Sequence, residues 1–517
     1  MAKGQQKVLQ TVNWPVFIMS GGFLLLFVVM AFTNMELTSF IVDKGFQLAI
    51  TYFGGYWQVL LLATFLVGAV LAFSKLGSVR IGKLDKPEMG FFKYLAIVVT
   101  TGLGAGGVFW AAAEPLYYFL EAPPTYSGII ETTNDAIQVA LAQSFISWGF
   151  SAWAVYGAIC SIVMVYAHNH KGMPLKPRTI LYPILGDRIQ DSKWGTAVDV
   201  FCIIGAAAGT IGPIGFLGLQ VSYGVNALFG WPDTYVTQVT IILTLTSIVL
   251  LSTLTGIEKG IQWLSKVNVN TALFIGVFLV LFGPGIFLID SYISATGTYL
   301  SHFIEMTTFR GDNEWSGAWM LFFFGWFIGF GPMVALMVAR ISRGRTIREL
   351  FLVVAIITPI LTNIWFTILG GSGIFYEIQT PGSIATPLEE NGLPAAIIAI
   401  ASQMPLGSMM PFLFLLLTIL FVVTTVDTMS YSLAMSVTGK GNPAKSIRFF
   451  WASIMSIIAM ILINVGNGGV NALQSFVVIA AVPVSLILLP LLWGAPKIAF
   501  LLAKEQGIIS SEEKNNK

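Results

Sequence analysis

The sequence predicts an all-α integral membrane protein with about twelve transmembrane helices. The chain is 56% hydrophobic and only 10% charged over 517 residues, whereas soluble domains carry about 25% charged residues. Its apolar runs are too long and too numerous for the roughly ten-residue alternating strands of a membrane barrel. A helix needs roughly 20 residues to cross a bilayer. The predicted spans are 14–33, 52–73, 92–119, 138–167, 196–224, 236–254, 268–289, 316–339, 350–375, 410–434, 447–465 and 472–500.

The charge distribution supports this count and predicts an orientation. With both termini in the cytoplasm, Lys44 and Arg310 are the only outer residues among the 27 Lys and Arg. Cytoplasmic loops of membrane proteins carry an excess of these residues. The first span is long and is followed by no small-residue cleavage site, so we expect no removable signal peptide. We expect a multi-pass protein of the cell membrane.

The third span contains a glycine-rich interruption. Residues 100–110 read Thr-Thr-Gly-Leu-Gly-Ala-Gly-Gly-Val-Phe-Trp, and three alanines, Glu114 and Pro115 follow. Irregular backbone at membrane depth survives only where it is buried in protein or lines a wet cavity. Such a segment indicates the substrate site of a transporter. Close packing of helices through small residues is the alternative interpretation.

The eighth span repeats this irregularity. It carries Gly325, Gly329, Gly331 and Pro332 within an aromatic, apolar run. The two interrupted spans lie five spans apart, as two five-helix repeats of opposite orientation would place them.

These observations divide the chain into six parts. Residues 291–315, between the seventh and eighth spans, mix aromatic residues with His302 and Glu305 and predict an amphipathic helix in the outer interface. The parts are a cytoplasmic tail (1–13), two peripheral helices with an inner loop (14–90), the first repeat (91–290), the interfacial helix (291–315), the second repeat (316–500) and a short cytoplasmic tail (501–517).

Four stretches resemble the betaine–choline–carnitine transporter family. They are the glycine segment ending in Phe109-Trp110-Ala-Ala-Ala-Glu114-Pro115, the run from Trp148 to Tyr156, the loop Ala-Arg-Ile-Ser-Arg-Gly-Arg-Thr-Ile-Arg-Glu at 339–349, and Thr424-Thr425-Val426-Asp427. The resemblance implies a LeuT-like fold whose inverted repeats are spans 3–7 and 8–12. It also implies a bacterial inner membrane, a homotrimer, and import of a betaine-like solute such as glycine betaine, choline or carnitine.

Aromatic residues supply the candidate substrate site. A quaternary ammonium has no N–H to donate, so ring faces must hold its charge, at about 0.5–2 kcal/mol each. If span four is one helix, Trp153 and Tyr156 lie about 140° and 80° round from Trp148, and the three rings line one side of a cavity. The resemblance matches these residues to the family's aromatic box. It adds a facing wall from Trp326, Phe327 and Phe330.

Other interpretations of this site stay open. The aromatic residues can equally pack helices or lie at the membrane interface. The family usually carries tryptophan where this chain has Phe327 and Phe330, and histidine where it has Ser147 and Ser151. Taurine or a sulfonium zwitterion is therefore an alternative solute.

The anionic end of a zwitterion needs hydrogen-bond donors. We expect them from backbone N–H groups of the broken helix near Gly102, Gly104 and Gly106, where a half-helix presents its positive end.

Hydroxyl groups on the tenth span predict a sodium site. Thr424 and Thr425 share a helix face with Phe421, and hard cations bind oxygen ligands. The resemblance matches them to a family sodium site completed by carbonyl groups of Thr100 and Leu103. The alternative is that both hydroxyls bond to their own helix. We expect sodium as the coupling ion, with no other metal or cofactor.

Charged residues close to the membrane complete the candidates. Glu114 and Asp427 are intramembrane carboxylates, which mark function or gating by default. Arg343 and Arg345 lie in the basic loop after the eighth span. We assign these four residues gating or structural roles.

Sodium symport is the main functional hypothesis, and sodium-independent exchange is the alternative within transport. A receptor or channel on the same scaffold belongs to a different class. The tails are too short for a signalling domain, and the continuous ring of charges or carbonyls expected of a channel is missing. An enzyme would need a metal or nucleophile cluster, and the sequence does not suggest one. We therefore expect that the protein is not an enzyme. The short, mixed C-terminal tail predicts weak or no osmotic activation.

Overall fold

The computed structural model describes residues 12–104, 106–126, 128–255, 258–438, 443–466 and 469–509. Most of the N-terminal tail and the last part of the C-terminal tail therefore lie outside the described residues. Within them the protein is helical, and extended pairing is limited to one isolated antiparallel bridge between Arg80 and Thr346.

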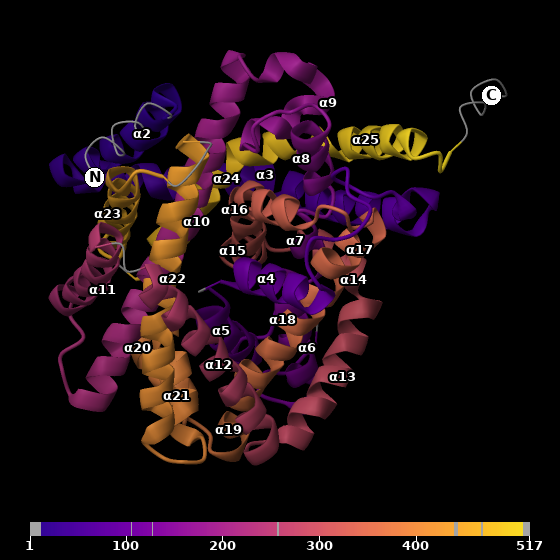
Figure 1. Cartoon of the computed structure of the whole chain (residues 1–517). Helices are drawn as coiled ribbons and strands as arrows, with labels where there is room; N and C mark the ends of the chain where they lie inside the picture. The colour runs from indigo at the N-terminus through magenta and orange to yellow at the C-terminus, as the bar shows by residue number, and fades with distance from the viewer. Residues whose placement is uncertain are drawn as a thin grey trace.

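The helices in the first half of the chain run from α2 to α13 (Figure 1). They are α2 (Trp14–Thr33), α3 (Met35–Phe73), α4 (Phe91–Leu103), α5 (Gly106–Leu120), α6 (Asn134–Ser147), α7 (Phe150–Ala154), α8 (Cys160–Asn169), α9 (Tyr182–Leu185), α10 (Lys193–Phe229), α11 (Tyr235–Thr255), α12 (Glu258–Phe282) and α13 (Gly285–Ser301). Short 3₁₀ turns lie at Lys75–Ser78, Pro177–Leu181 and Gly186–Ile189.

The second half contains α14 to α25. They are α14 (Phe303–Thr308), α15 (Asn313–Ala318), α16 (Met320–Ile341), α17 (Ile347–Phe351), α18 (Thr358–Phe366), α19 (Ser372–Gln379), α20 (Ala385–Asn391), α21 (Ala396–Gln403), α22 (Met409–Thr438), α23 (Lys445–Leu462), α24 (Asn471–Leu488) and α25 (Leu491–Glu505). A 3₁₀ turn lies at Leu393–Ala395.

Ten helical segments in the described residues are long and apolar enough to cross a membrane, and the bent pair α4 and α5 adds an eleventh. The protein is therefore a multi-pass membrane protein. The predicted fourth span, 138–167, is not among them because its helix is interrupted.

The third span is broken where the glycines predict a break. Helices α4 and α5 meet at an angle of 66°. Gly104 lies at the end of α4 with a φ of +51°, which favours glycine because this residue has no Cβ. Gly102 lies two residues earlier, still inside α4.

The fourth span corrects a sequence expectation. Helix α6 ends at Ser147, Trp148 and Gly149 separate it from the five-residue helix α7, and α8 begins only at Cys160. Trp148, Trp153 and Tyr156 therefore do not share one continuous helix, and angles calculated at 100° per residue do not apply to them. Gly157, with a φ of +138°, lies in the second interruption.

Helix α10 forms the centre of the bundle and is almost wholly buried. It packs on α22, α24 and α16, and Figure 1 shows α10 and α22 side by side. The ninth span is one continuous helical run in which π-helical turns at Leu352–Ile357 and Thr367–Gly371 flank α18. Such turns occur often at functional sites.

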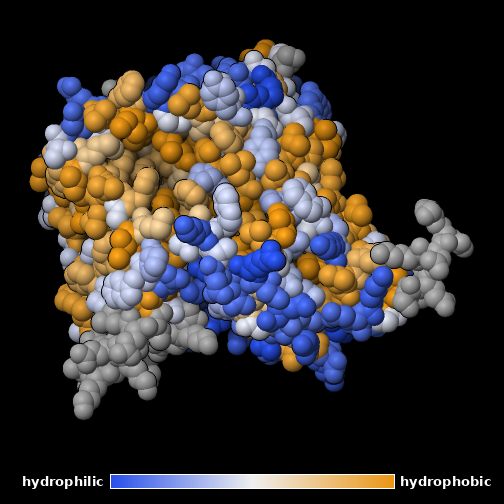
Figure 2. Space-filling model, turned by 90° about the horizontal axis from the view of Figure 1, so that it is seen from above, coloured by the Kyte–Doolittle hydropathy of each residue, from blue (hydrophilic) through white to orange (hydrophobic). Residues whose placement is uncertain are grey.

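The last predicted span is shorter than expected. Helix α24 ends at Leu488 and α25 begins at Leu491, so residues 472–500 form two helices. Figure 1 shows α25 running toward the C-terminus at the edge of the molecule, near α8. Figure 2, which views the molecule from above, shows a band of hydrophilic residues next to hydrophobic surfaces.

The segment predicted as an interfacial helix, 291–315, contains parts of more than one helix. A break at residues 283–284 ends α12, and α13 and α14 cover most of 285–308. Helix α13 packs along α6.

Candidate functional site

A cavity of about 750 Å³ lies beside the break in the third span. Helices α4, α5, α10, α12, α16, α18 and α22 contribute to its wall. Among the described residues, no Asp, Glu, Lys, Arg or His lines this cavity. A solute inside it therefore meets rings, backbone groups and neutral polar side chains.

Aromatic rings from the interrupted fourth span and from α16 form one side of the cavity. The predicted interruption of the eighth span is wrong, because α16 runs without a break from Met320 to Ile341 with Pro332 inside it. Tyr156 stacks on Phe327 with ring centroids 4.5 Å apart, and Trp148 lies 5.4 Å from Phe327 and 5.8 Å from Trp326. Phe330 lies 6.2 Å from Tyr156. The structure thus brings together the aromatic residues that the sequence singled out.

These rings do not all face the cavity. Trp148, Tyr156, Trp326 and Phe330 line it. Phe327 and Trp153 are at most 1% exposed, and their rings are 6.1 Å apart. They lie behind the lining rings and pack against them.

The glycines allow this close approach of rings to backbone. A Cβ on Gly102 would lie 2.2 Å from the ring of Trp153, and a Cβ on Gly106 would lie 2.2 Å from the ring of Trp326. The indole N–H of Trp326 also donates a 3.0 Å hydrogen bond to the carbonyl oxygen of Gly209. The Trp326 ring therefore lies against Gly106 of α5 and is bonded to Gly209 of α10.

Glu114 positions the aromatic wall from inside the bundle. Its carboxylate is fully buried and accepts a 2.9 Å hydrogen bond from the indole N–H of Trp148. Glu114 does not line the cavity. The observed contact of Glu114 is this hydrogen bond to the Trp148 ring.

The predicted sodium ligands lie in the wall of the same cavity. Thr100, Leu103, Phe421, Thr424 and Thr425 all line the cavity. The hydroxyl of Thr424 donates to the carbonyl oxygens of Leu420 and Phe421, at 2.8 and 3.3 Å, as the alternative interpretation expects.

Two polar atoms near these residues are available to a ligand. No hydrogen bond joins the hydroxyl of Thr425 to another described residue. Asn268 of α12 is 3% exposed, and its Oδ1 lacks a hydrogen-bond partner in the described part of the chain. Both residues line the cavity. Oxygen atoms of this kind suit a hard monovalent cation.

Sequence reasoning missed Asn268 and Trp365. Trp365 of α18 lines the cavity, and its indole N–H donates a 3.0 Å hydrogen bond to the carbonyl oxygen of Gly107. No local pattern marks either residue, because a single Asn or Trp in an apolar span does not reveal which face lines a cavity.

The remaining charged candidates form contacts outside the cavity wall. Asp427 pairs with Arg448 of α23 at 2.8 Å, which joins α22 to α23. Arg343 pairs with Glu88 at 3.2 Å. The guanidinium of Arg345 is buried over the ring of Tyr94, 4.0 Å from its centroid.

The loop that contains these arginines is fixed to the segment before α4. Arg345 also pairs with Glu349 and donates to the carbonyl oxygen of Met89 at 2.7 Å. The backbone N–H of Ile81 donates to the carbonyl oxygen of Arg345 at 3.0 Å. These contacts hold the loop against the segment before α4.

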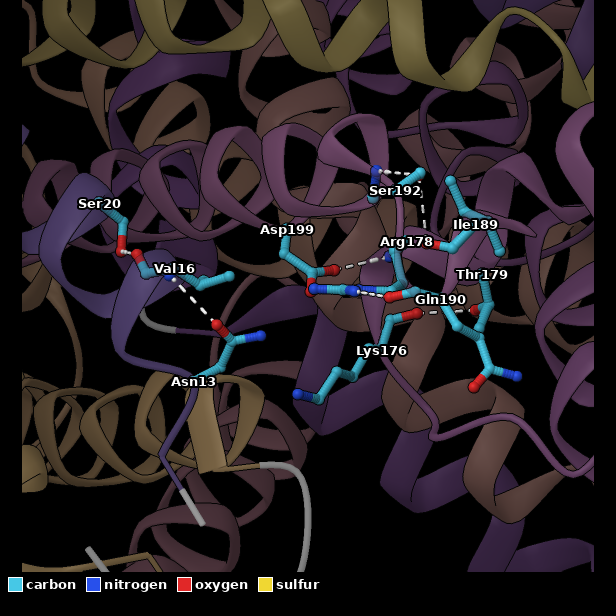
Figure 3. Close-up of polar contacts among 11 residues, drawn as sticks. Asn13, Val16, Ser20, Lys176, Arg178, Thr179, Ile189, Gln190, Ser192 and Asp199 are labelled. Atoms are coloured by element: carbon cyan, nitrogen blue, oxygen red, sulfur yellow. Dashed lines mark hydrogen bonds and ion pairs between the residues drawn. The ribbon is translucent and has the colours of Figure 1, made fainter. Parts of the chain in front are cut away.

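A further buried ion pair lies between the fourth and fifth spans (Figure 3). Arg178 and Asp199 are 2.8 Å apart, and the backbone N–H of Arg178 also donates to the Asp199 carboxylate at 2.8 Å. Burial lowers the pKa of the neighbouring Lys176 below its ordinary value. The pair attaches the loop before α10 to that central helix.

The comparisons with known proteins agree with this architecture. A model of the family described as "BCCT, betaine/carnitine/choline family transporter" matches residues 15–503. The chain belongs to this family. It is therefore a membrane transporter rather than an enzyme.

The similarity to named relatives covers most of the chain. It is 49% identical to glycine betaine transporter 2 of Vibrio parahaemolyticus over 96% of this chain and 92% of that protein. It is 33% identical to the glycine betaine transporter OpuD of Bacillus subtilis, over 89% of each. It is 30% identical to an ectoine/hydroxyectoine transporter of Virgibacillus pantothenticus, over 93% of this chain and 95% of that protein.

Proposed function

We propose that this transporter imports a net-neutral zwitterion with a quaternary ammonium group, glycine betaine in the first place, together with sodium. The observation that carries the proposal is the cavity itself, which has aromatic walls and no charged lining residue among those described. A solute with a net charge would lose its hydration there and would meet no side chain of opposite charge. A zwitterion carries both charges itself and therefore has no net charge to compensate.

The ammonium end of the solute fits the aromatic side. Trp148, Tyr156, Trp326 and Phe330 present rings from two different spans. A trimethylammonium group has a diffuse charge and an apolar surface, so rings attract it without a hydrogen bond. Two of the relatives, each named as a glycine betaine transporter, support this choice of solute.

The carboxylate end fits the start of α5. The first N–H groups of a helix have no partner within that helix, and they form the positive end of its dipole. Gly106 and Gly107 lie in this first turn and line the cavity. Because Gly102 lies inside α4, we assign the donors to residues 106–108 rather than to Gly102.

Sodium fits the hydroxyl side of the same cavity. The free hydroxyl of Thr425, the rotatable hydroxyl of Thr424 and the last carbonyl groups of α4 provide neutral oxygen ligands. An ion there would lie near the broken helix that binds the solute. Occupation of one site would then favour occupation of the other, because both depend on the arrangement of the same backbone.

The assembly and orientation follow the resemblance and the charge distribution. We place both termini in the cytoplasm of a bacterial cell and the protein in the inner membrane as a homotrimer.

Uptake of labelled glycine betaine into proteoliposomes tests the proposal. We expect accumulation with an inward sodium gradient and none when potassium replaces sodium. Thr425→Ala should lose this dependence, while Thr244→Ala, which changes an exposed threonine of α11 outside the cavity, should not. Uptake that needs preloaded solute instead of sodium would identify an exchanger. Uptake of taurine or a sulfonium zwitterion, but not of glycine betaine, would refute the proposed substrate.

A further inference from the structure

The indole of Trp365 is held at the junction of three helices. It belongs to α18, and its N–H donates to the carbonyl oxygen of Gly107 in the first turn of α5 at 3.0 Å. On α12, a Cβ at Gly276 would lie 3.6 Å from Cζ3 of the Trp365 ring, which is ordinary contact. The hydrogen bond therefore ties the polar edge of the ring to α5, and α12 lies beside the ring with no side chain at Gly276.

This ring also faces the cavity. Trp365 is partly exposed, and Leu361, Ile364 and Ile368 of the same continuous helical run line the cavity with it. Their spacing of three, four and seven residues places them on one helix face. The π-helical turn at Thr367–Gly371 follows directly, and such turns often occur at functional sites.

We infer that Trp365 is a fifth substrate-binding ring, contributed by the ninth span, that contacts the quaternary ammonium group. This inference rests on the proposed function. Tryptophan is the best of the aromatic side chains for binding cations. Because the N–H of Trp365 is already bonded to Gly107, the polar edge of the indole is satisfied and its face is left for the solute.

A purely structural tryptophan would have the same hydrogen bond but no contact with solute. Two substitutions separate these roles. Trp365→Phe removes the N–H and keeps a ring, whereas Trp365→Leu keeps apolar bulk and removes the ring. Trp451 supplies a matched control, because it is fully buried in α23, packs against Phe17 and Phe450, and does not line the cavity.

The Kd of detergent-purified protein for glycine betaine tests the inference. We expect Trp365→Leu to raise this Kd about 5- to 30-fold, the ratio that corresponds to a contact of about 1–2 kcal/mol. Trp365→Phe should have a smaller effect, and Trp451→Leu should leave the Kd unchanged. Equal effects of Trp365→Leu and Trp451→Leu would overturn the inference.

Fluorinated tryptophan at position 365 gives a second test that does not depend on the stability of a variant. Each fluorine weakens the negative face of the ring but keeps its shape and its N–H. The Kd for glycine betaine should rise with each added fluorine, and a constant Kd would overturn the inference. A wild-type protein that does not bind glycine betaine would overturn the proposed function and this inference together. If the wild type binds but no change at position 365 alters the Kd, only this inference is overturned.

Discussion

Adding one methyl group at Gly106 should damage the aromatic wall of the cavity. A Cβ there would lie 2.2 Å from the Trp326 ring, whereas ordinary contacts begin at 3.4 Å, so the ring must move about 1.2 Å. Retreat is restricted, because the indole N–H is bonded to Gly209 and the ring lies 5.6 Å from that of Phe322. Overpacking of this kind costs about 1–3 kcal/mol.

The consequence for Gly106→Ala is weaker binding of solute. If the displaced ring loses a cation–π contact of about 0.5–2 kcal/mol, the Kd for glycine betaine rises about 2- to 30-fold. Calorimetric titration of purified protein measures this value, and a thermal melt reports any unfolding. Gly55→Ala is the matched control, because nothing lies within 4 Å of its added Cβ in α3. Wild-type affinity in Gly106→Ala would refute the assignment of Trp326 to the binding wall.

Three other changes have defined outcomes. Glu114→Met leaves the buried indole N–H of Trp148 without its acceptor, at a cost of about 1–3 kcal/mol. This variant should therefore have lower affinity for betaine. Glu114→Gln keeps an acceptor and should bind betaine like the wild type. Thr425→Ala should abolish the sodium dependence of betaine uptake, and Thr425→Ser, which keeps a hydroxyl, should retain it; an unchanged sodium dependence in Thr425→Ala would exclude this hydroxyl as a ligand. Burial lowers the pKa of His170, although Glu505 acts to raise it, so the folded protein binds this proton less well than the unfolded chain. The melting temperature should therefore fall as the pH drops below about 6.5, and His170→Gln should remove that step.

Local composition predicted the break in the third span but not those in the fourth. Several glycines within a few residues disfavour a continuous helix, so the junction at Gly104 could be located from sequence. The fourth span offers only Gly149 and Gly157 near its interruptions. Because single glycines are tolerated inside membrane helices, this chain gave too little reason to expect two breaks.

Proline shows the same ambiguity near the C-terminus. Pro483 lies inside α24, whereas Pro490 separates α24 from α25. Both are prolines in one long apolar run. Tertiary packing decides which of them ends a helix, and sequence alone does not report it.

The site could be predicted only where the sequence carried a recognisable motif. The aromatic residues of spans four and eight were identified by resemblance, and they meet even though the fourth span is interrupted. Trp365 and Asn268 belong to no such motif. Their place in the cavity wall depends on how α18 and α12 pack against the broken helix, which is information from residues far apart in the chain.

The central claim is that solute and sodium bind cooperatively in one cavity. The most direct test is the Kd for glycine betaine of purified wild-type protein and Thr425→Ala, in sodium and in potassium at equal ionic strength. We predict tighter binding in sodium for the wild type and the same Kd in both salts for Thr425→Ala. Equal wild-type affinity in the two salts, or an undiminished sodium effect in the variant, would contradict the account.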